Sequence, residues 1–258
     1  MLGRIYPLLM LLFCSGAHAA DFHFVPRNGV GPSTIRLDGP ISDGDTEKLR
    51  TWILSNPAEY LVTNNIELSS SGGSVAEAMK LARLVELSGW TALVNPGETC
   101  ASACFFIFSS AQVRISAGDV VVHRPYFDKV AQHPTEHFAQ IDAQSGAAIA
   151  ARDYLSAKGV SSRIVDLMMS LPSSRGYVLT SRDFNELGYL APVAEEQAIR
   201  RCSIDNLDFL AKYSHNRECI ESIFIPLRNS MIEKTLGAEA LQAAGPRARA
   251  LYLNQLVE

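Results

Sequence analysis

The chain carries near its middle the stretch TCASAC at residues 99–104, followed at once by the apolar run FFIF at residues 105–108. The small residues around Ser102 and the apolar run after them predict a turn that leads into a buried helix. Upstream, SSSGGS at residues 69–74 precedes an amphipathic helix pattern. Downstream, DVVVHRP at residues 119–125 is typical of a buried strand that ends in a histidine.

These three segments contain the parts of a serine-nucleophile site. A serine hydroxyl becomes a good nucleophile when a base takes its proton and when N–H donors face the developing oxyanion. Ser102 is the candidate nucleophile and His123 the candidate base, while Gly72 and Gly73 can bring backbone N–H groups close to a substrate carbonyl. Each residue also has a structural explanation, since serine caps helices well and glycines form turns. Their combination in this order is what predicts a site.

The wider pattern alternates short strands with helices. We expect strands at residues 34–37, 65–68, 91–94, 113–115 and 120–122. We expect helices at residues 42–54, 74–88, 135–158 and 161–169, one that starts at Ser102, and one at residues 183–187 capped by Thr180. Ser74 and Glu77 have the spacing of a capping box, and Gly89 is the expected helix stop. This alternation predicts an α/β fold with helices packed on a largely parallel sheet.

Residues 1–19 have the pattern of a secretory signal peptide. A short region with Arg4 precedes an apolar stretch at residues 6–14, and AHA at residues 17–19 is a cleavage signal. Phe13 argues against a lipoprotein signal built on Cys14. The apolar stretch is too short to span a bilayer, so we expect a periplasmic or secreted protein that is not embedded in the membrane after cleavage.

Four cysteines remain once residues 1–19 are removed. An even number of cysteines in an exported protein favours disulfides. Cys202 and Cys219 stand alone in the C-terminal region, and we predict that they pair. Cys100 and Cys104 flank Ser102 and are either bonded to each other or both reduced, because one helical turn is an awkward separation for a bridge.

The chain divides by pattern into a signal peptide (1–19), an α/β domain (20–196) and a helical C-terminal appendage (197–258). In the appendage we expect helices at residues 204–213 and 217–236, joined as a hairpin by the disulfide. The formal net charge of −4, without a basic patch, argues against a nucleic-acid partner. No cofactor is predicted, and a homo-oligomer stays open.

The order and spacing of the three segments resemble the ClpP/crotonase superfamily over roughly residues 35–193. The resemblance is strongest to periplasmic ClpP-like proteins that carry a Cys-Ala-Ser-Ala-Cys turn. It implies ClpP/crotonase-like β-α repeats and a peptide or protein substrate. It also implies that Ser102 is the nucleophile, that His123 is the base, and that the N–H of Ala103 forms the oxyanion hole with that of Gly72 or Gly73.

The chain departs from that family at the third triad member. Aligning residues 179–188 with the family's closing helix puts the acid at Arg175 or Gly176, where no carboxylate stands. Three aspartates elsewhere are weak substitutes: Asp153, Asp166 and Asp183. Two lysines are candidates for a Ser-Lys dyad: Lys129 and Lys158.

Two other chemistries are weighed against the serine site. HPTEH at residues 133–137 fits an H-x-x-E-H zinc pattern, but Pro134 keeps His133 out of helical geometry, so no metal is predicted. Crotonase-type chemistry on a coenzyme A thioester conflicts with export. We therefore expect an exported serine peptidase or related acyl hydrolase, with a catalytically silent ClpP-like binding or scaffold protein as the alternative.

Overall fold

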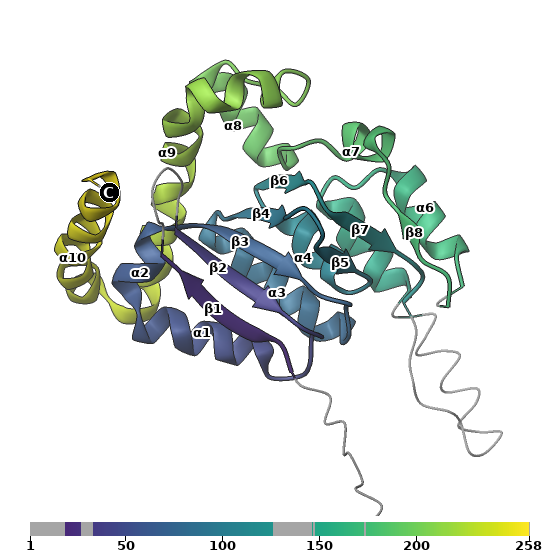
Figure 1. The fold of residues 1–258 in the computed structure, drawn as a ribbon, viewed down its shortest axis with the longest axis horizontal. Helices are drawn as coiled ribbons and strands as arrows, with labels where there is room; N and C mark the ends of the chain where they lie inside the picture. The colour runs from purple at the N-terminus through teal and green to yellow at the C-terminus, as the bar shows by residue number, and fades with distance from the viewer. Residues whose placement is uncertain (1–18, 27–32, 126–145, 147, 173, 258) are drawn as a thin grey trace, which may run out of the picture.

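The computed structural model of the protein describes residues 19–26, 33–125, 146, 148–172 and 174–257. Within these ranges the larger sheet has the strand order β1-β2-β3-β4-β6 (Figure 1). Its strands are β1 (Asp21–Val25), β2 (Ser33–Asp38), β3 (Thr63–Ser69), β4 (Thr91–Val94) and β6 (Val113–Ser116). Only β1 runs antiparallel to its neighbour in this sheet, which confirms the predicted, largely parallel α/β architecture.

A smaller sheet lies beside the larger one. It contains β5 (Thr99–Ala101), β7 (Asp119–Val122) and β8 (Tyr177–Val178), with β7 in the middle. β5 runs parallel to β7, and β8 runs antiparallel to β7. A bridge between Ser70 and Cys100 continues the pairing from the end of β3 to β5. The two sheets are thereby joined at the segment that carries Ser102.

The helices of the α/β part cover these sheets. They are α1 (Asp45–Ser55), α2 (Pro57–Val62), α3 (Val75–Ser88), α4 (Cys104–Ser110), α6 (Ser162–Ser170) and α7 (Ser181–Leu187), and residues 148–157 are also helical. The predicted helices are confirmed in this part of the chain, although the prediction lacked α2. The expected start of one helix at residue 135 lies outside the described residues.

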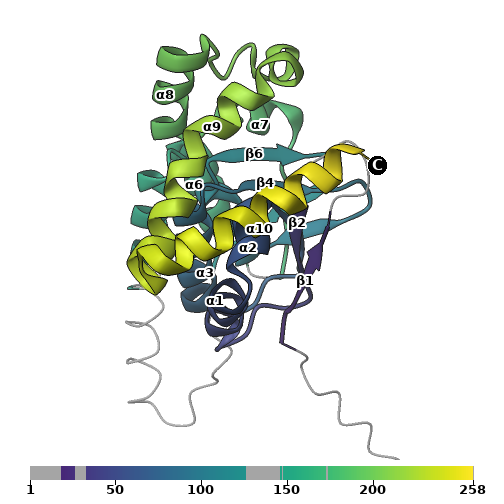
Figure 2. The ribbon, with the colours of Figure 1, turned by 90° about the vertical axis from the view of Figure 1, so that its left-hand side faces the viewer.

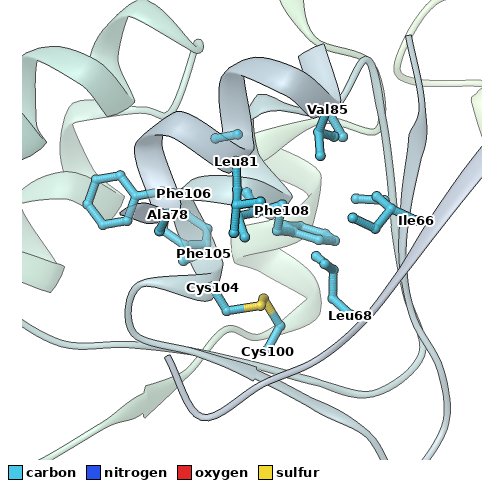
Figure 3. Close-up of a cluster of buried hydrophobic side chains, with 14 of the residues drawn as sticks. Ile66, Leu68, Ala78, Leu81, Val85, Cys100, Cys104, Phe105, Phe106 and Phe108 are labelled. Atoms are coloured by element: carbon cyan, nitrogen blue, oxygen red, sulfur yellow. A yellow bond between two sulfur atoms is a disulfide. The ribbon is translucent and has the colours of Figure 1, made fainter. Parts of the chain in front are cut away.

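The core forms where α3 and α4 meet β3. Every residue of α4 is buried, as expected of an apolar helix that serves as a core element. Figure 3 shows its phenylalanines packed against side chains of the neighbouring elements. These side chains are Ile66 and Leu68 from β3, and Ala78, Leu81 and Val85 from α3.

The capping box predicted for α3 is only half formed. The Ser74 hydroxyl accepts a hydrogen bond from the Glu77 N–H, as predicted. The Glu77 carboxylate, however, accepts from the Thr46 N–H at 2.8 Å instead of closing the box. The first turn of α1 also has unpaired N–H groups, and the buried Glu77 carboxylate satisfies one of them. The Glu77 side chain thus links α3 to α1.

The helix that was expected to start at residue 42 begins at Asp45 instead. The Asp45 carboxylate accepts a hydrogen bond from the backbone N–H of Ser42.

The C-terminal region is helical, with α8 (Pro192–Cys202), α9 (Phe209–Leu236) and α10 (Ala238–Val257). The prediction of separate helices at residues 204–213 and 217–236 was wrong, because α9 runs unbroken through residues 214–216. That segment contains neither glycine nor proline. The predicted Cys202–Cys219 disulfide is confirmed, with a Cα–Cα distance of 5.9 Å, and joins the end of α8 to α9.

The C-terminal helices pack directly on the α/β part. A Cβ on Gly89 would lie 2.7 Å from the Cβ of Phe224 in α9, so this glycine allows close helix packing. Figure 2 shows α10 crossing in front of α2, and these two helices contact each other. The division at residue 196 stays a prediction. No helix within the described ranges combines the length and apolar character needed to cross a bilayer.

Candidate active site

Three chain segments meet at the ends of parallel strands. Ala101, the last residue of β5, pairs with Val121 of β7, and the Ser102 N–H donates to the Val121 carbonyl at 2.8 Å. On the other side of β5, the Ala101 N–H donates to the Ser70 carbonyl. Three segments therefore lie side by side at the C-terminal ends of β3, β5 and β7: residues 70–73, Ser102 in the middle, and His123.

Ser102 has an unusual backbone conformation. Its φ is 56°, in the left-handed region that residues other than glycine rarely adopt. Alternation along β5 would place its side chain on the same face as the buried Cys100, but this φ ends the alternation and leaves Ser102 half-buried. Helix α4 has Ala103 as its N-cap and no side-chain cap hydrogen bond, so Ser102 does not act as a helix cap.

A disulfide joins the two cysteines that flank this turn. Cys100 and Cys104 are bonded, with a Cα–Cα distance of 5.3 Å, which decides between the two states left open by the sequence. Both residues are fully buried, and Figure 3 shows the bond beneath the aromatic side chains of α4. The turn that carries Ser102 is thus fastened to the core at both ends.

The glycine turn packs against the serine turn. A Cβ on Gly72 would lie 2.6 Å from the Ser102 Cβ and 3.0 Å from the Ala103 nitrogen, and its φ is 95°. Only glycine fits this position without strain. A Cβ on Gly73 would lie 2.1 Å from the Ile41 carbonyl oxygen, so the second glycine is also required.

The two glycines differ in what their N–H groups do. The Gly72 N–H donates to the Ser70 hydroxyl at 3.1 Å. Among the described residues, neither the Gly73 N–H nor the Ala103 N–H has a hydrogen-bond acceptor. Sequence reasoning missed Ser70, although a serine two residues before a turn N–H is a known turn signal. The N–H groups of Gly73 and Ala103 are therefore open to a ligand within the described part of the chain, and that of Gly72 is not.

His123 is half-buried, and its ring is held by the backbone. Its Nδ1 lies 3.0 Å from the carbonyl oxygen of Arg124. A carbonyl only accepts hydrogen bonds, so this contact is satisfied when Nδ1 carries the proton. The lone pair is then on Nε2, which is the state required of a general base.

The position opposite His123 has no side chain. In β8, Val178 pairs with Val121 and Tyr177 with Val122, so continuing this register sets Gly176 opposite His123. A Cβ on Gly176 would lie 2.5 Å from the Val121 Cγ1. Of the two positions at which the sequence puts the acid, Gly176 could therefore hold a carboxylate only if Val121 moved, and the other carries Arg175.

The substitute acids have other partners. Burial alone would raise the pKa of Asp183, but hydrogen bonds from Arg163, Thr180 and Tyr177 outweigh it and lower the pKa to about 2. Asp183 closes the capping box of α7 with Thr180. Asp166 accepts from Arg152 at 2.6 Å on the surface.

The remaining candidates are placed as follows. Asp153 is exposed. The Lys158 amino group donates a hydrogen bond to the Glu86 carboxylate of α3 at 2.7 Å, so it is engaged away from Ser102. Lys129 and the residues of the H-x-x-E-H pattern, 133–137, lie outside the described residues. Within the described ranges no cluster of histidine, cysteine or acidic side chains is arranged to hold a metal ion.

Comparisons with known proteins add limited information. No family model matches the chain, and no curated protein matches it. One similar solved structure is a mutant of the 1510-N membrane-bound stomatin-specific protease, with 14% identity, a TM-score of 0.39, and coverage of 60% of this chain and 75% of that chain. Another is a mutant of ClpP1 from Listeria monocytogenes, with 18% identity, a TM-score of 0.41, and coverage of 61% of this chain and 88% of that chain.

With TM-scores this low, neither similarity carries an argument about the activity of this chain. Periplasmic location and the meaning of the Cys-Ala-Ser-Ala-Cys turn stay predictions. What the site can do chemically follows from its own residues: a serine in the left-handed region, a histidine whose Nδ1 contacts a backbone carbonyl, and two backbone N–H groups without an acceptor among the described residues.

Proposed function

We propose that the protein is a serine hydrolase that cleaves peptides, with Ser102 as nucleophile and His123 as general base. The observation that carries the proposal is the left-handed Ser102, held by a disulfide at the end of β5 beside the end of β7. Non-glycine residues persist in this conformation only where the surrounding structure enforces it, and such residues cluster at active sites.

Each part of the site has a role in the proposed mechanism. His123 Nε2 takes the proton from the Ser102 hydroxyl as Oγ attacks the acyl carbon. The N–H groups of Gly73 and Ala103 donate to the oxyanion that forms. His123 then hands the proton to the leaving group, and a water molecule hydrolyses the acyl-enzyme by the same route.

Turnover is expected to be slow. A triad carboxylate both orients the base and stabilises the imidazolium that forms, and its removal costs about 10⁴ in kcat in a serine protease. In this chain the Arg124 carbonyl supplies the orientation. A neutral carbonyl stabilises a positive ring less than a carboxylate does, so acylation should be easier to detect than repeated turnover.

The alternative is a catalytically silent binding or scaffold protein. The missing side chain at Gly176, opposite His123, favours this alternative. A silent protein would keep the fold and the glycine turn but would not activate Ser102.

Labelling with a fluorophosphonate separates the two functions. An activated Ser102 should be modified in the wild type, as located by mass spectrometry, and Ser102→Ala should abolish the label. His123→Ala should slow labelling strongly, while Ser203→Ala, which changes a serine outside the site, should not. Equal labelling of wild type and Ser102→Ala would contradict the assignment. A folded wild type that takes no label would establish the silent alternative.

We also infer that the protein is exported and acts on peptides or proteins outside the cytoplasm. The two disulfides support this inference, because structural disulfides persist in oxidising compartments. The protein purified from an exporting host should have the mass of a chain that begins at Ala20. A mature chain that retains residues 1–19 would contradict export by a cleaved signal.

A further inference from the structure

Two arginines flank the candidate base. Arg124 follows His123 at the end of β7, and Arg175 precedes Gly176 at the start of β8. The β7–β8 pairing ends at Val122 and Tyr177, so Arg124 and Arg175 each lie two residues beyond it, at the same end of the two strands. Both arginines are exposed. Figure 1 shows β7 and β8 side by side at this edge of the smaller sheet.

Neither arginine is neutralised within the described part of the chain. No acidic side chain there forms an ion pair with Arg124 or Arg175. Nearby arginines behave differently, since Arg152 pairs with Asp166 and Arg163 pairs with Asp183. Two unpaired like charges at the same end of a strand pair repel each other, so the fold gains nothing from placing both there. An anion bound between them would remove the repulsion.

The strand order indicates on which side of the cleaved bond the two arginines lie. The segments lie in the order glycine turn, Ser102, His123 and β8. The acyl oxygen faces the glycine turn, whereas His123 protonates the leaving group. The arginines therefore lie on the leaving-group side. On the opposite side, the exposed residue next to the glycine turn is acidic: Asp43 accepts a hydrogen bond from the Ser74 hydroxyl.

We propose that Arg124 and Arg175 form a carboxylate-binding subsite that selects substrates with an anionic group on the leaving-group side of the cleaved bond. This inference rests on the proposed hydrolase function. A guanidinium binds a carboxylate through two parallel N–H bonds, which gives direction as well as attraction. The carboxylate has two sources: an acidic side chain or the free C-terminus of the peptide.

The test uses matched peptides and cleavage measured by mass spectrometry. The peptides carry glutamate or glutamine after the cleaved bond, and each has a free or an amidated C-terminus. Comparing glutamate with glutamine in amidated peptides reports the side chain. Comparing free with amidated glutamine peptides reports the terminus. The wild type should cleave the preferred anionic form about tenfold faster than the neutral one, from ion pairs that contribute a few-fold each.

Variants of the two arginines then assign the preference. Arg124→Gln and Arg175→Gln should each lower it to about threefold, and the double variant should remove it. Arg124→Lys and Arg175→Lys retain the positive charge, so each should keep more of the preference for anionic peptides than the glutamine variant at the same position. Arg249→Gln on α10 makes the same charge change away from the site and should leave it unchanged.

The outcomes separate this inference from the proposed function. A wild type that takes the fluorophosphonate label at Ser102 but cleaves anionic and neutral peptides equally overturns the subsite and leaves the hydrolase intact. A preference that survives in the double glutamine variant also overturns it. A wild type that takes no label overturns the hydrolase itself.

Discussion

Replacing Ser102 by glycine should stabilise the protein relative to replacing it by alanine, although both changes remove the nucleophile. Ser102 and Ser203 are the only residues other than glycine with positive φ in the described ranges, at 56° and 55°. Ser203 ends helix α8 as an exposed C-cap and is not part of the site. The chain therefore contains a matched control for backbone strain without chemistry.

The magnitude follows from the backbone. An L-residue in the left-handed region costs about 1–2 kcal/mol, which alanine retains and glycine does not. Glycine loses more conformational entropy on folding, which offsets about 0.5–1 kcal/mol of that gain. Ser102→Gly should therefore exceed Ser102→Ala in unfolding free energy by about 0.5–1 kcal/mol. For a chain of this size the difference corresponds to about 1–4 °C in Tm.

Urea unfolding of four variants measures the effect, with fluorophosphonate labelling as the second readout. Ser203→Gly should exceed Ser203→Ala by a similar amount and keep the label. Ser102→Gly should show the same gain in unfolding free energy over Ser102→Ala but take no label, because activity at a strained site comes at the expense of stability. If Ser203 behaves this way but Ser102→Gly is no more stable than Ser102→Ala, the argument from strain at Ser102 is refuted.

Three further changes have defined outcomes. Gly72→Ala should abolish labelling and lower stability by more than about 1 kcal/mol, because the new Cβ would lie 2.6 Å from the Ser102 Cβ; labelling and urea unfolding measure both effects. Replacing Cys202 and Cys219 together by alanine should lower the unfolding free energy by about 3 kcal/mol yet leave labelling intact. Asp183→Asn should cost about 2 kcal/mol at neutral pH, because the folded-state pKa of about 2 lies below the unfolded value of about 3.9. That cost should shrink as pH falls from about 4 towards 2, and urea unfolding at pH 7 and pH 3 would show it.

The repeating part of the fold could be predicted from the sequence. Strands β2, β3, β4, β6 and β7 and helices α3 and α4 follow from apolar periodicity and from cap and stop residues. Strands β5 and β8 could not be predicted, because three and two residues are too few for a period. Their pairing with β7 depends on contacts distant in sequence, and these two strands place Ser102 and Gly176.

Local rules failed where a tertiary contact competed for the same group. The Glu77 carboxylate has the spacing for its own capping box but accepts from Thr46 of α1 instead. The predicted C-terminal helices were wrong for a different reason, because no residue marks the boundary that was expected between residues 213 and 217. There the sequence predicted the Cys202–Cys219 pair but not the bounds of the helix that it joins to α8.

For the site, the sequence predicted residue types and their order, while the structure supplied conformation. The pattern predicted Ser102, His123 and the glycine pair as candidates, but the left-handed φ of Ser102 has no signal in its residue type. Our proposal of Gly73 over Gly72 as oxyanion donor depends on Ser70, whose hydroxyl accepts from the Gly72 N–H. Residue spacing does not encode such a single hydrogen bond.

The lack of a carboxylate at Gly176, opposite His123, is matched by the packing of the smaller sheet. Val121 occupies the space that a Cβ on Gly176 would need, and Val121 is also the residue whose carbonyl holds the Ser102 N–H. The same residue thus fixes the serine turn and excludes a carboxylate opposite His123. The ring is oriented instead by the carbonyl of Arg124, a residue that Pro125 restricts to extended backbone. In the proposed mechanism, this carbonyl favours the tautomer that a base requires but provides no charge to stabilise the imidazolium, which is why we expect a slow acylating enzyme.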